Sequence, residues 1–175
     1  ADTQTVSTVT IEEKVPAGAY AVVDTLTAPA SSTSYAWTWT KTFGGADAEG
    51  VYDYRIVVRD VAGNVHTSSA AATVSVHLDR TAPAAPTVTA PTAGAYYGED
   101  STILRGTASD ASSGVALVEW SADGGAAWFA ADGTTSWTRD LDLRAGGVNP
   151  VAALRDQGQK EILVRATDLA GNVSG

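Results

Sequence analysis

The sequence predicts an all-β protein of sandwich or barrel architecture, and three observations point to this fold class. Apolar residues alternate with polar ones in many short runs, turn-forming residues separate these runs, and no long helical pattern interrupts them. Short strands at such spacing are typical of sandwiches and barrels, in which each strand buries one of its two faces.

The strands follow one another along the whole chain. Residues 52–58 and 162–166 show the clearest alternation, and Val, Ile, Thr, Tyr and Trp, which favour strands, are frequent elsewhere. Gly63-Asn64 and Gly171-Asn172 are typical turn dipeptides. Only 148–158 has the pattern of a helical turn, which we interpret as a loop insertion. The other expected strands are 20–27, 35–43, 71–78, 86–90, 101–108, 115–121, 126–131 and 135–143.

Composition excludes several classes of protein. The formal net charge of −9 argues against a nucleic-acid partner, because a polyanion is bound by Lys and Arg. No apolar run approaches the roughly 18 to 20 residues that span a bilayer, so we expect no membrane insertion. The absence of cysteine excludes a disulfide scaffold, a thiolate metal site and a cysteine nucleophile.

The sequence repeats itself at an offset of about 108 residues. Asp60-Val61-Ala62-Gly63-Asn64 matches Asp168-Leu169-Ala170-Gly171-Asn172, and a short segment rich in proline, 77–86, lies between the two copies. We therefore predict two modules, 1–80 and 81–175, joined by a semi-rigid connection.

Each predicted module lacks strands that the other one has. The first copy has no counterpart of most of 86–114, so its opening strands are missing, and the second has no counterpart of 71–78, its last strand. Two explanations stay open: the chain is a window of a longer array, or identical subunits exchange strands. In the second case 1–12 is the candidate donor strand, because 5–11 resembles 73–78.

These motifs carry a family resemblance. An alternating strand closed by Asp-x-Ala-Gly-Asn, then a further strand and Asp-x-Thr-Ala-Pro at 79–83, resembles the bacterial Ig-like tandem repeats of large secreted adhesins and surface fibres. The resemblance implies two tandem immunoglobulin-like β-sandwich modules, each incomplete. It also implies an extracellular or cell-surface location, and neighbouring modules or identical subunits as partners; it specifies no ligand for the far end of such a protein.

The resemblance also places three carboxylates together. It implies that Asp79 of the connection, Asp110 and Asp168 meet where the chain enters the second module, and that calcium is bound at such junctions. Calcium takes 6–8 oxygen ligands, and close carboxylates repel one another without a cation. Asp60, with Asp2 or Asp24, is a weaker version of the same site. The alternative is that Asp60 and Asp168 only accept backbone N–H groups of their own turns.

Aromatic residues allow a second kind of site. Alternation puts Tyr35, Trp37, Trp39 and Phe43 on one side of their strand, where large aromatics usually form core. We expect the same of Trp120, Trp128 and Trp137. Trp128 lies beside the Gly124-Gly125 turn and is the candidate ligand residue if the chain is a carbohydrate-binding accessory module of a secreted enzyme.

Catalytic patterns are missing from the sequence. His66 and His77, the only histidines, lie outside any metal-binding or triad motif, and no nucleophile elbow or phosphate-binding loop occurs. We therefore predict a non-enzymatic structural module of a surface protein, forming part of a stalk, fibre or filament. The alternatives are a fibre subunit that polymerises through its N-terminal strand, and the carbohydrate-binding module.

Overall fold

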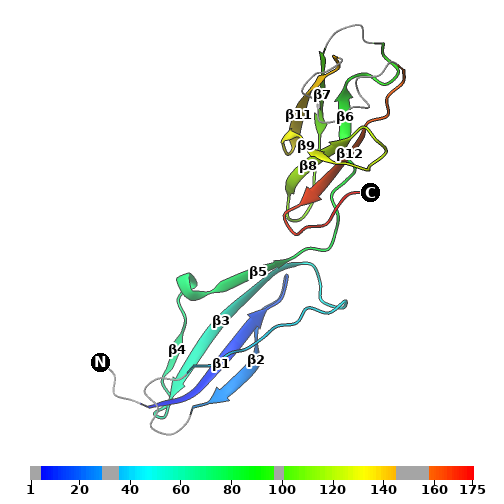
Figure 1. Ribbon diagram of the computed structural model, residues 1–175. Coiled ribbons are helices and arrows are strands. Elements are labelled where there is room, and N and C mark those ends of the chain that lie inside the picture. Colours follow the sequence, from blue (N-terminus) through cyan, green and yellow to red (C-terminus); the bar gives the residue numbers. More distant parts are fainter. Residues whose placement is uncertain (1–4, 29–35, 97–100, 145–157) are drawn as a thin grey trace. The chain divides into compact units, whose positions relative to one another are not determined.

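The computed structural model describes residues 5–28, 36–96, 101–144 and 158–175. The chain divides into two compact units, Ala1–Asp79 and Arg80–Gly175, next to the predicted boundary after residue 80 (Figure 1). No helix among the described residues is both long and apolar enough to cross a membrane.

The first unit is built on one five-stranded antiparallel sheet. β1 is central and pairs with β2 along one edge and with β3 along the other. The second edge of β3 carries two short strands in succession, β4 and then β5, with the 3₁₀ turn η1 between them. The bounds are β1 Val6–Lys14, β2 Tyr20–Thr27, β3 Gly50–Asp60, β4 Val65–Thr67, η1 Ala70–Ala72 and β5 Val74–Leu78.

The two faces of this sheet carry different kinds of side chain, because successive residues of a strand point to opposite faces. On one face, Asp53 and Arg55 of β3 form ion pairs with Lys14 and Glu12 of β1. On the other face, Tyr52 and Tyr54 receive aromatic rings from residues 36–43. Phe43 packs edge-on against Tyr52 with ring centroids 4.9 Å apart, and Trp39 packs against Tyr54 at 5.4 Å. Residues 36–43 thus supply the apolar cover of the first unit.

The second unit is a sandwich of two antiparallel sheets. One sheet has the order β10-β11-β7-β6 and the other the order β12-β8-β9. The bounds are β6 Thr87–Ala90, β7 Ser101–Thr107, β8 Val115–Ser121, β9 Phe129–Ala130, β10 Asp132–Gly133, β11 Ser136–Asp142 and β12 Leu163–Asp168.

Apolar side chains from both sheets form the core of this sandwich. Leu104 of β7 and Trp137 of β11 face Val118 and Trp120 of β8, and each of the four is at most 2% exposed. Among the described residues of this unit, the buried core residues are Leu104, Ala108, Val118, Trp120, Ala122, Trp137, Leu141 and Ala166.

The structure confirms the all-β, immunoglobulin-like class of fold, and it changes several details. Residues 36–43, expected within a strand over 35–43, alternate in burial but pair with no described strand, because β-propensity favours an extended chain and does not supply a hydrogen-bonded neighbour. Strand 71–78 begins only at Val74, after η1, and strand 126–131 shortens to Phe129–Ala130. Most of 148–158 and residue Tyr35 lie outside the described residues.

The proposed donor segment has a definite place in the first unit. Residues 6–12 belong to β1, whose register runs without a free edge between β2 and β3. In this structure, the segment therefore completes its own sheet (Figure 1).

Candidate metal centre

The repeated Asp-x-Ala-Gly-Asn segments form the same hydrogen-bonded turn in both units. In the first unit, Asn64 donates its backbone N–H to Asp60 Oδ1 (2.8 Å) and its side-chain amide to Asp60 Oδ2 (2.6 Å). In the second unit, Asn172 donates to Asp168 in the same two ways, at 2.8 Å each. Gly63 and Gly171 have φ of 91° and 93°, which glycine adopts without strain. These two carboxylates therefore close their own turns.

The turn after β7 is organised by another aspartate. Asp110 Oδ1 accepts the backbone N–H groups of Ser112 (3.0 Å) and Gly114 (2.8 Å). Leu169 N then donates to Gly114 O at 3.0 Å, which ties this turn to the turn that follows β12. Local hydrogen bonds thus bring Asp110 close to Asp168.

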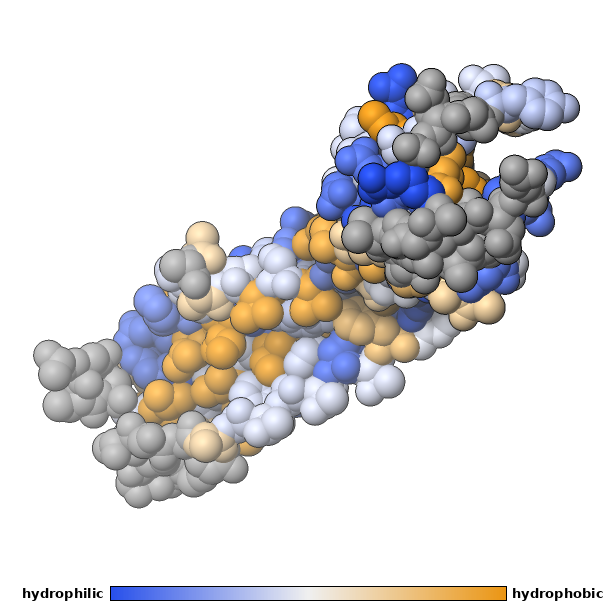
Figure 2. Space-filling view, turned by 45° about the horizontal axis from the view of Figure 1, so that its top comes forward, coloured by the Kyte–Doolittle hydropathy of each residue, from blue (hydrophilic) through white to orange (hydrophobic). Residues whose placement is uncertain are grey.

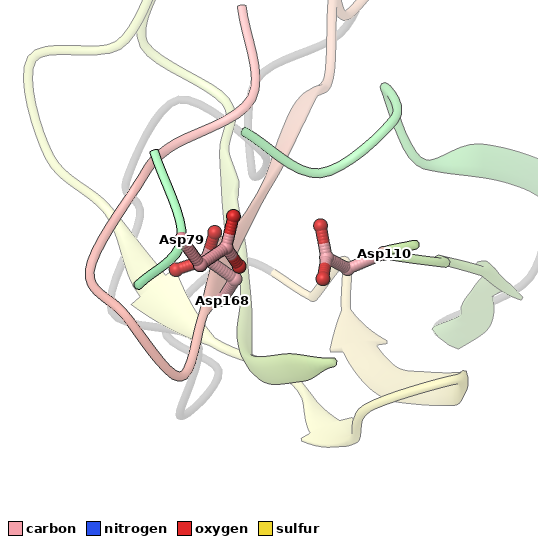
Figure 3. A group of neighbouring side chains, drawn as sticks. All are labelled: Asp79, Asp110 and Asp168. Atoms are coloured by element: carbon pink, nitrogen blue, oxygen red, sulfur yellow. The ribbon is translucent and has the colours of Figure 1, made fainter. Parts of the chain in front are cut away.

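Asp79 completes a cluster of three carboxylates. Asp79 directly follows β5 and lies within the connecting segment 77–86, and it is 7% exposed, while Asp168 is 2% exposed. One carboxylate oxygen of each of Asp79, Asp110 and Asp168 lies within 4.8 Å of the other two. Figure 3 shows the carboxyl group of Asp110 directed toward those of Asp79 and Asp168.

One carboxylate oxygen of the cluster lacks a hydrogen-bond partner. Asp110 Oδ2 is buried and has no hydrogen-bond partner, whereas Oδ1 of the same group is saturated by two N–H donors. A buried carboxylate oxygen without a partner is costly, and nearby like charges increase this cost. A hard divalent cation would supply the missing positive charge, with further oxygens from loop carbonyls and water. The three residues therefore fit a calcium site.

Asp60, the fourth predicted ligand, is not brought into such a group. Among the described residues, the Asp79, Asp110 and Asp168 group is the one cluster of this kind. Asp24, a possible partner of Asp60, accepts the backbone N–H of Thr25 on β2, and Asp2 lies outside the described residues. The hydrogen bond from the Asn64 side chain lowers the pKa of Asp60 below its usual 3.8, as expected for a carboxylate that closes a turn.

Trp128, the candidate ligand residue, is engaged within its own unit. The guanidinium carbon of Arg165 lies 4.1 Å from the centre of the Trp128 ring, and Arg165 Nε donates to Glu119 at 2.8 Å. One face of the ring is therefore occupied by a cation and is not free to stack on a sugar. Trp120 and Trp137 are buried, at 0% and 2% exposure, which agrees with their expected place in the core.

The first unit contains a polar group that was not predicted from the sequence. Glu13, which is 8% exposed, accepts the Tyr54 hydroxyl at 2.9 Å and pairs with Lys41 at 3.0 Å. The hydrogen bond to Glu13 raises the pKa of Lys41 above its usual value, and burial together with Glu13 raises that of Tyr54. Lys41 shares the alternation of Trp39 and Phe43, which was the only sequence signal that it points inward. The group is a satisfied ion pair in which Glu13 is buried and Lys41 is half-buried.

Comparisons with known proteins place this geometry in context. Residues 86–164 match the profile of a family described as Bacterial Ig domain. Fibronectin(III)-like modules of CbhA from Clostridium thermocellum align with 100% of this chain and 76% of theirs, at 18% identity and a TM-score of 0.43. A 1.5-MDa bacterial ice-binding adhesin aligns at 16% identity and a TM-score of 0.34, over 97% of this chain and 51% of its own. No curated protein matches the chain.

Proposed function

We propose that this chain is a non-enzymatic structural segment of an extracellular bacterial surface protein, in which tandem modules act as spacers in a stalk, fibre or filament. The observation that carries the proposal is the duplicated module itself. The same strand, turn and aspartate–asparagine pair occur twice, and a short connection joins the two copies. The match of 86–164 to a bacterial Ig domain family supports the same reading.

Calcium is the second part of the proposal. A calcium ion held by Asp79, Asp110 and Asp168 would offset two of the three negative charges and give Asp110 Oδ2 a partner. It would also fix the residue that begins the connection to two turns of the second unit, and so restrict bending of the connection at this residue. A spacer holds its two ends apart, and a connection that bends less keeps this distance more constant.

Thermal unfolding of the whole chain with calcium and with a chelator tests this proposal. Calcium at about 100 times its dissociation constant is expected to add about 2.7 kcal/mol and to raise the melting temperature of the second unit by about 10–20 °C. Asp110→Asn should lose most of this rise. Asp140→Asn, which changes an exposed aspartate of β11, is the matched control and should keep it. An equal melting temperature with and without calcium would remove the metal from the proposal.

No observation favours the two alternative functions over the spacer. A chain that donated residues 1–12 to a neighbour would first have to break the pairing of β1 with β2 and β3. A sugar could stack on Trp128 only at the ring face that Arg165 does not occupy. Loss of a glycan-array signal on Trp128→Ala, with the fold intact, would restore the carbohydrate-binding function.

A further inference from the structure

The carboxylate of Asp168 is held by three N–H groups of its own turn. Its Oδ1 accepts the backbone N–H groups of Ala170 and Asn172, at 2.8 Å each. Its Oδ2 accepts the side-chain amide of Asn172, also at 2.8 Å. One of the three donors is therefore a side chain, which a substitution can remove while the backbone donors stay.

These bonds make the two oxygens of Asp168 unequal. An ionised carboxylate accepts hydrogen bonds at about four positions, two on each oxygen. Both positions of Oδ1 are taken by backbone N–H groups, whereas Oδ2 keeps one position beside the Asn172 amide. Oδ2 is therefore the oxygen of Asp168 that is left for a cation.

The carboxylate of Asp110 is divided in the same way. Its Oδ1 accepts the backbone N–H groups of Ser112 and Gly114, two and four residues later, which is the spacing that Asp168 also uses. Gly114 has no side chain that could reach Asp110 Oδ2, and this oxygen is buried without a partner. The Asp110 turn thus closes with backbone donors alone, so the side-chain amide of Asn172 is an addition to a turn of this kind.

The orientation of Asp168 matters because of where its carboxylate lies. Asp168 is 2% exposed, and one of its oxygens lies within 4.8 Å of oxygens of Asp79 and Asp110 (Figure 3). The terminal torsion of an aspartate has broad energy wells, so the side chain does not fix the direction of its oxygens by itself. Hydrogen bonds from outside the metal site are what orient a ligand carboxylate.

We infer that Asn172 is a positioning residue of the calcium site, whose side-chain amide holds Asp168 so that Oδ2 faces the other two carboxylates. The inference rests on the proposed function, because it assigns Asn172 a role toward the ion proposed there. This role goes beyond closing the turn, which Asn64 does equally for Asp60 in the first unit.

Calorimetric titration of the whole chain with calcium tests the inference. Asn172→Ala should raise the dissociation constant for calcium by about tenfold or more, the usual effect of losing a hydrogen bond that orients a metal ligand. Asn64→Ala is the matched control. It removes the equivalent side-chain hydrogen bond from the turn that has no carboxylate cluster, and it should leave the dissociation constant unchanged.

Thermal unfolding in chelator separates positioning from a general loss of stability. Each variant loses one side-chain hydrogen bond of an equivalent turn, so each should lower the melting temperature of its own unit without calcium. If Asn172 only closed its turn, Asn172→Ala would show this drop and would keep the dissociation constant of the original chain.

Asn172→Ser provides a second measurement in case the alanine variant does not fold. Its hydroxyl is one bond shorter than the amide of asparagine, so it should hold Asp168 less well and give an intermediate dissociation constant. Equal dissociation constants for the original chain and the folded Asn172 variants would overturn the inference alone. An original chain that binds no calcium would overturn the site and the inference together.

Discussion

Asp60 and Asp168 close equivalent turns and differ in their surroundings. Each holds an asparagine four residues later through two hydrogen bonds, so each is needed by its own turn. Asp168 is 2% exposed and also belongs to the carboxylate cluster, whereas Asp60 does not. Asp60 therefore has a structural role alone, whereas Asp168 has the same structural role and is also a candidate metal ligand.

The Asp60 turn predicts a defined response to acid. The pKa of Asp60 is lowered by the hydrogen bond from the Asn64 side chain, so its contribution to stability is present above the unfolded value of 3.8 and is lost as the pH falls through the lower folded value. An NMR titration of the Asp60 carboxyl carbon should give a midpoint below 3.8. Asn64→Ala should move it back up, and a midpoint at or above 3.8 in the original chain would contradict the assignment.

The surroundings of Gly106 in β7 leave no room for a methyl group, so Gly106→Ala should destabilise the second unit. A Cβ at this position would collide with the carbonyl oxygen of Thr87 on β6 and with the Trp137 ring, at 2.5 Å from its Cζ2 atom. Gly106→Ala is therefore expected to lower the free energy of unfolding of the second unit by about 1–3 kcal/mol, measured by denaturant titration. Gly45→Ala, where a Cβ meets nothing within 4 Å, is the control and should change it little.

At the scale of elements, the two units share a trio of side chains on paired strands. Arg55 pairs with Glu12 and lies 3.9 Å from the centre of the Tyr20 ring. Arg165 pairs with Glu119 and lies 4.1 Å from the centre of the Trp128 ring. The carboxylate strand, the arginine strand and the aromatic residue have the same order in both units. The trio links neighbouring strands and explains why an aromatic residue recurs at positions 20 and 128.

This trio predicts a structural cost for losing Trp128. Trp128→Ala removes the ring beneath Arg165 and should lower the free energy of unfolding of the second unit by about 1 kcal/mol. Trp128→Phe, which keeps an aromatic face, should cost less. Denaturant titration of the three chains measures this order, and equal stability of all three would show that the stack contributes nothing.

Two patterns in the sequence led to predictions about strands that differ from the structure. The alternation of 35–43 correctly put Trp39 and Phe43 on the inner side, yet residues 36–43 form no strand in the described part of the sheet. The likeness of 5–11 to 73–78 reflects two strands of one sheet, β1 and β5, both paired with β3. A strand pattern records which face is buried and does not record which neighbour provides the hydrogen bonds.

At the scale of the whole chain, the two units have different cores. Among the residues that the structure describes, eight apolar ones are buried in the second unit and one, Tyr52, in the first. Val51, Ile56, Val65, Val74 and Val76 of the first unit are all more than a third exposed, and Figure 2 shows apolar side chains at the surface of this unit. Burial of apolar area is the main stabilising contribution to folding, so the first unit should have a lower free energy of unfolding than the second.

This difference predicts unequal stability within one chain. In native-state hydrogen exchange, the slowest amides of β1 and β3 should open with a lower free energy than those of β8 and β12. Leu104→Ala, in the core of the second unit, is expected to lower the opening free energy of β8 and β12 by about 2–5 kcal/mol. Slower exchange in β1 and β3 than in β8 and β12 would contradict the prediction.

The fold class, most strand positions and the repeated turn could be predicted from the sequence, because alternation and turn chemistry are local properties of the chain. The resemblance of its motifs to bacterial Ig-like repeats also implied that Asp79, Asp110 and Asp168 meet. The structure was needed to show that Asp110 Oδ2 lacks a partner within this group while Asp60 stands apart, that Arg165 lies against one face of Trp128, and that Glu13 pairs with Lys41. Each of these depends on which strands become neighbours, and strand pairing joins residues that are far apart in the sequence.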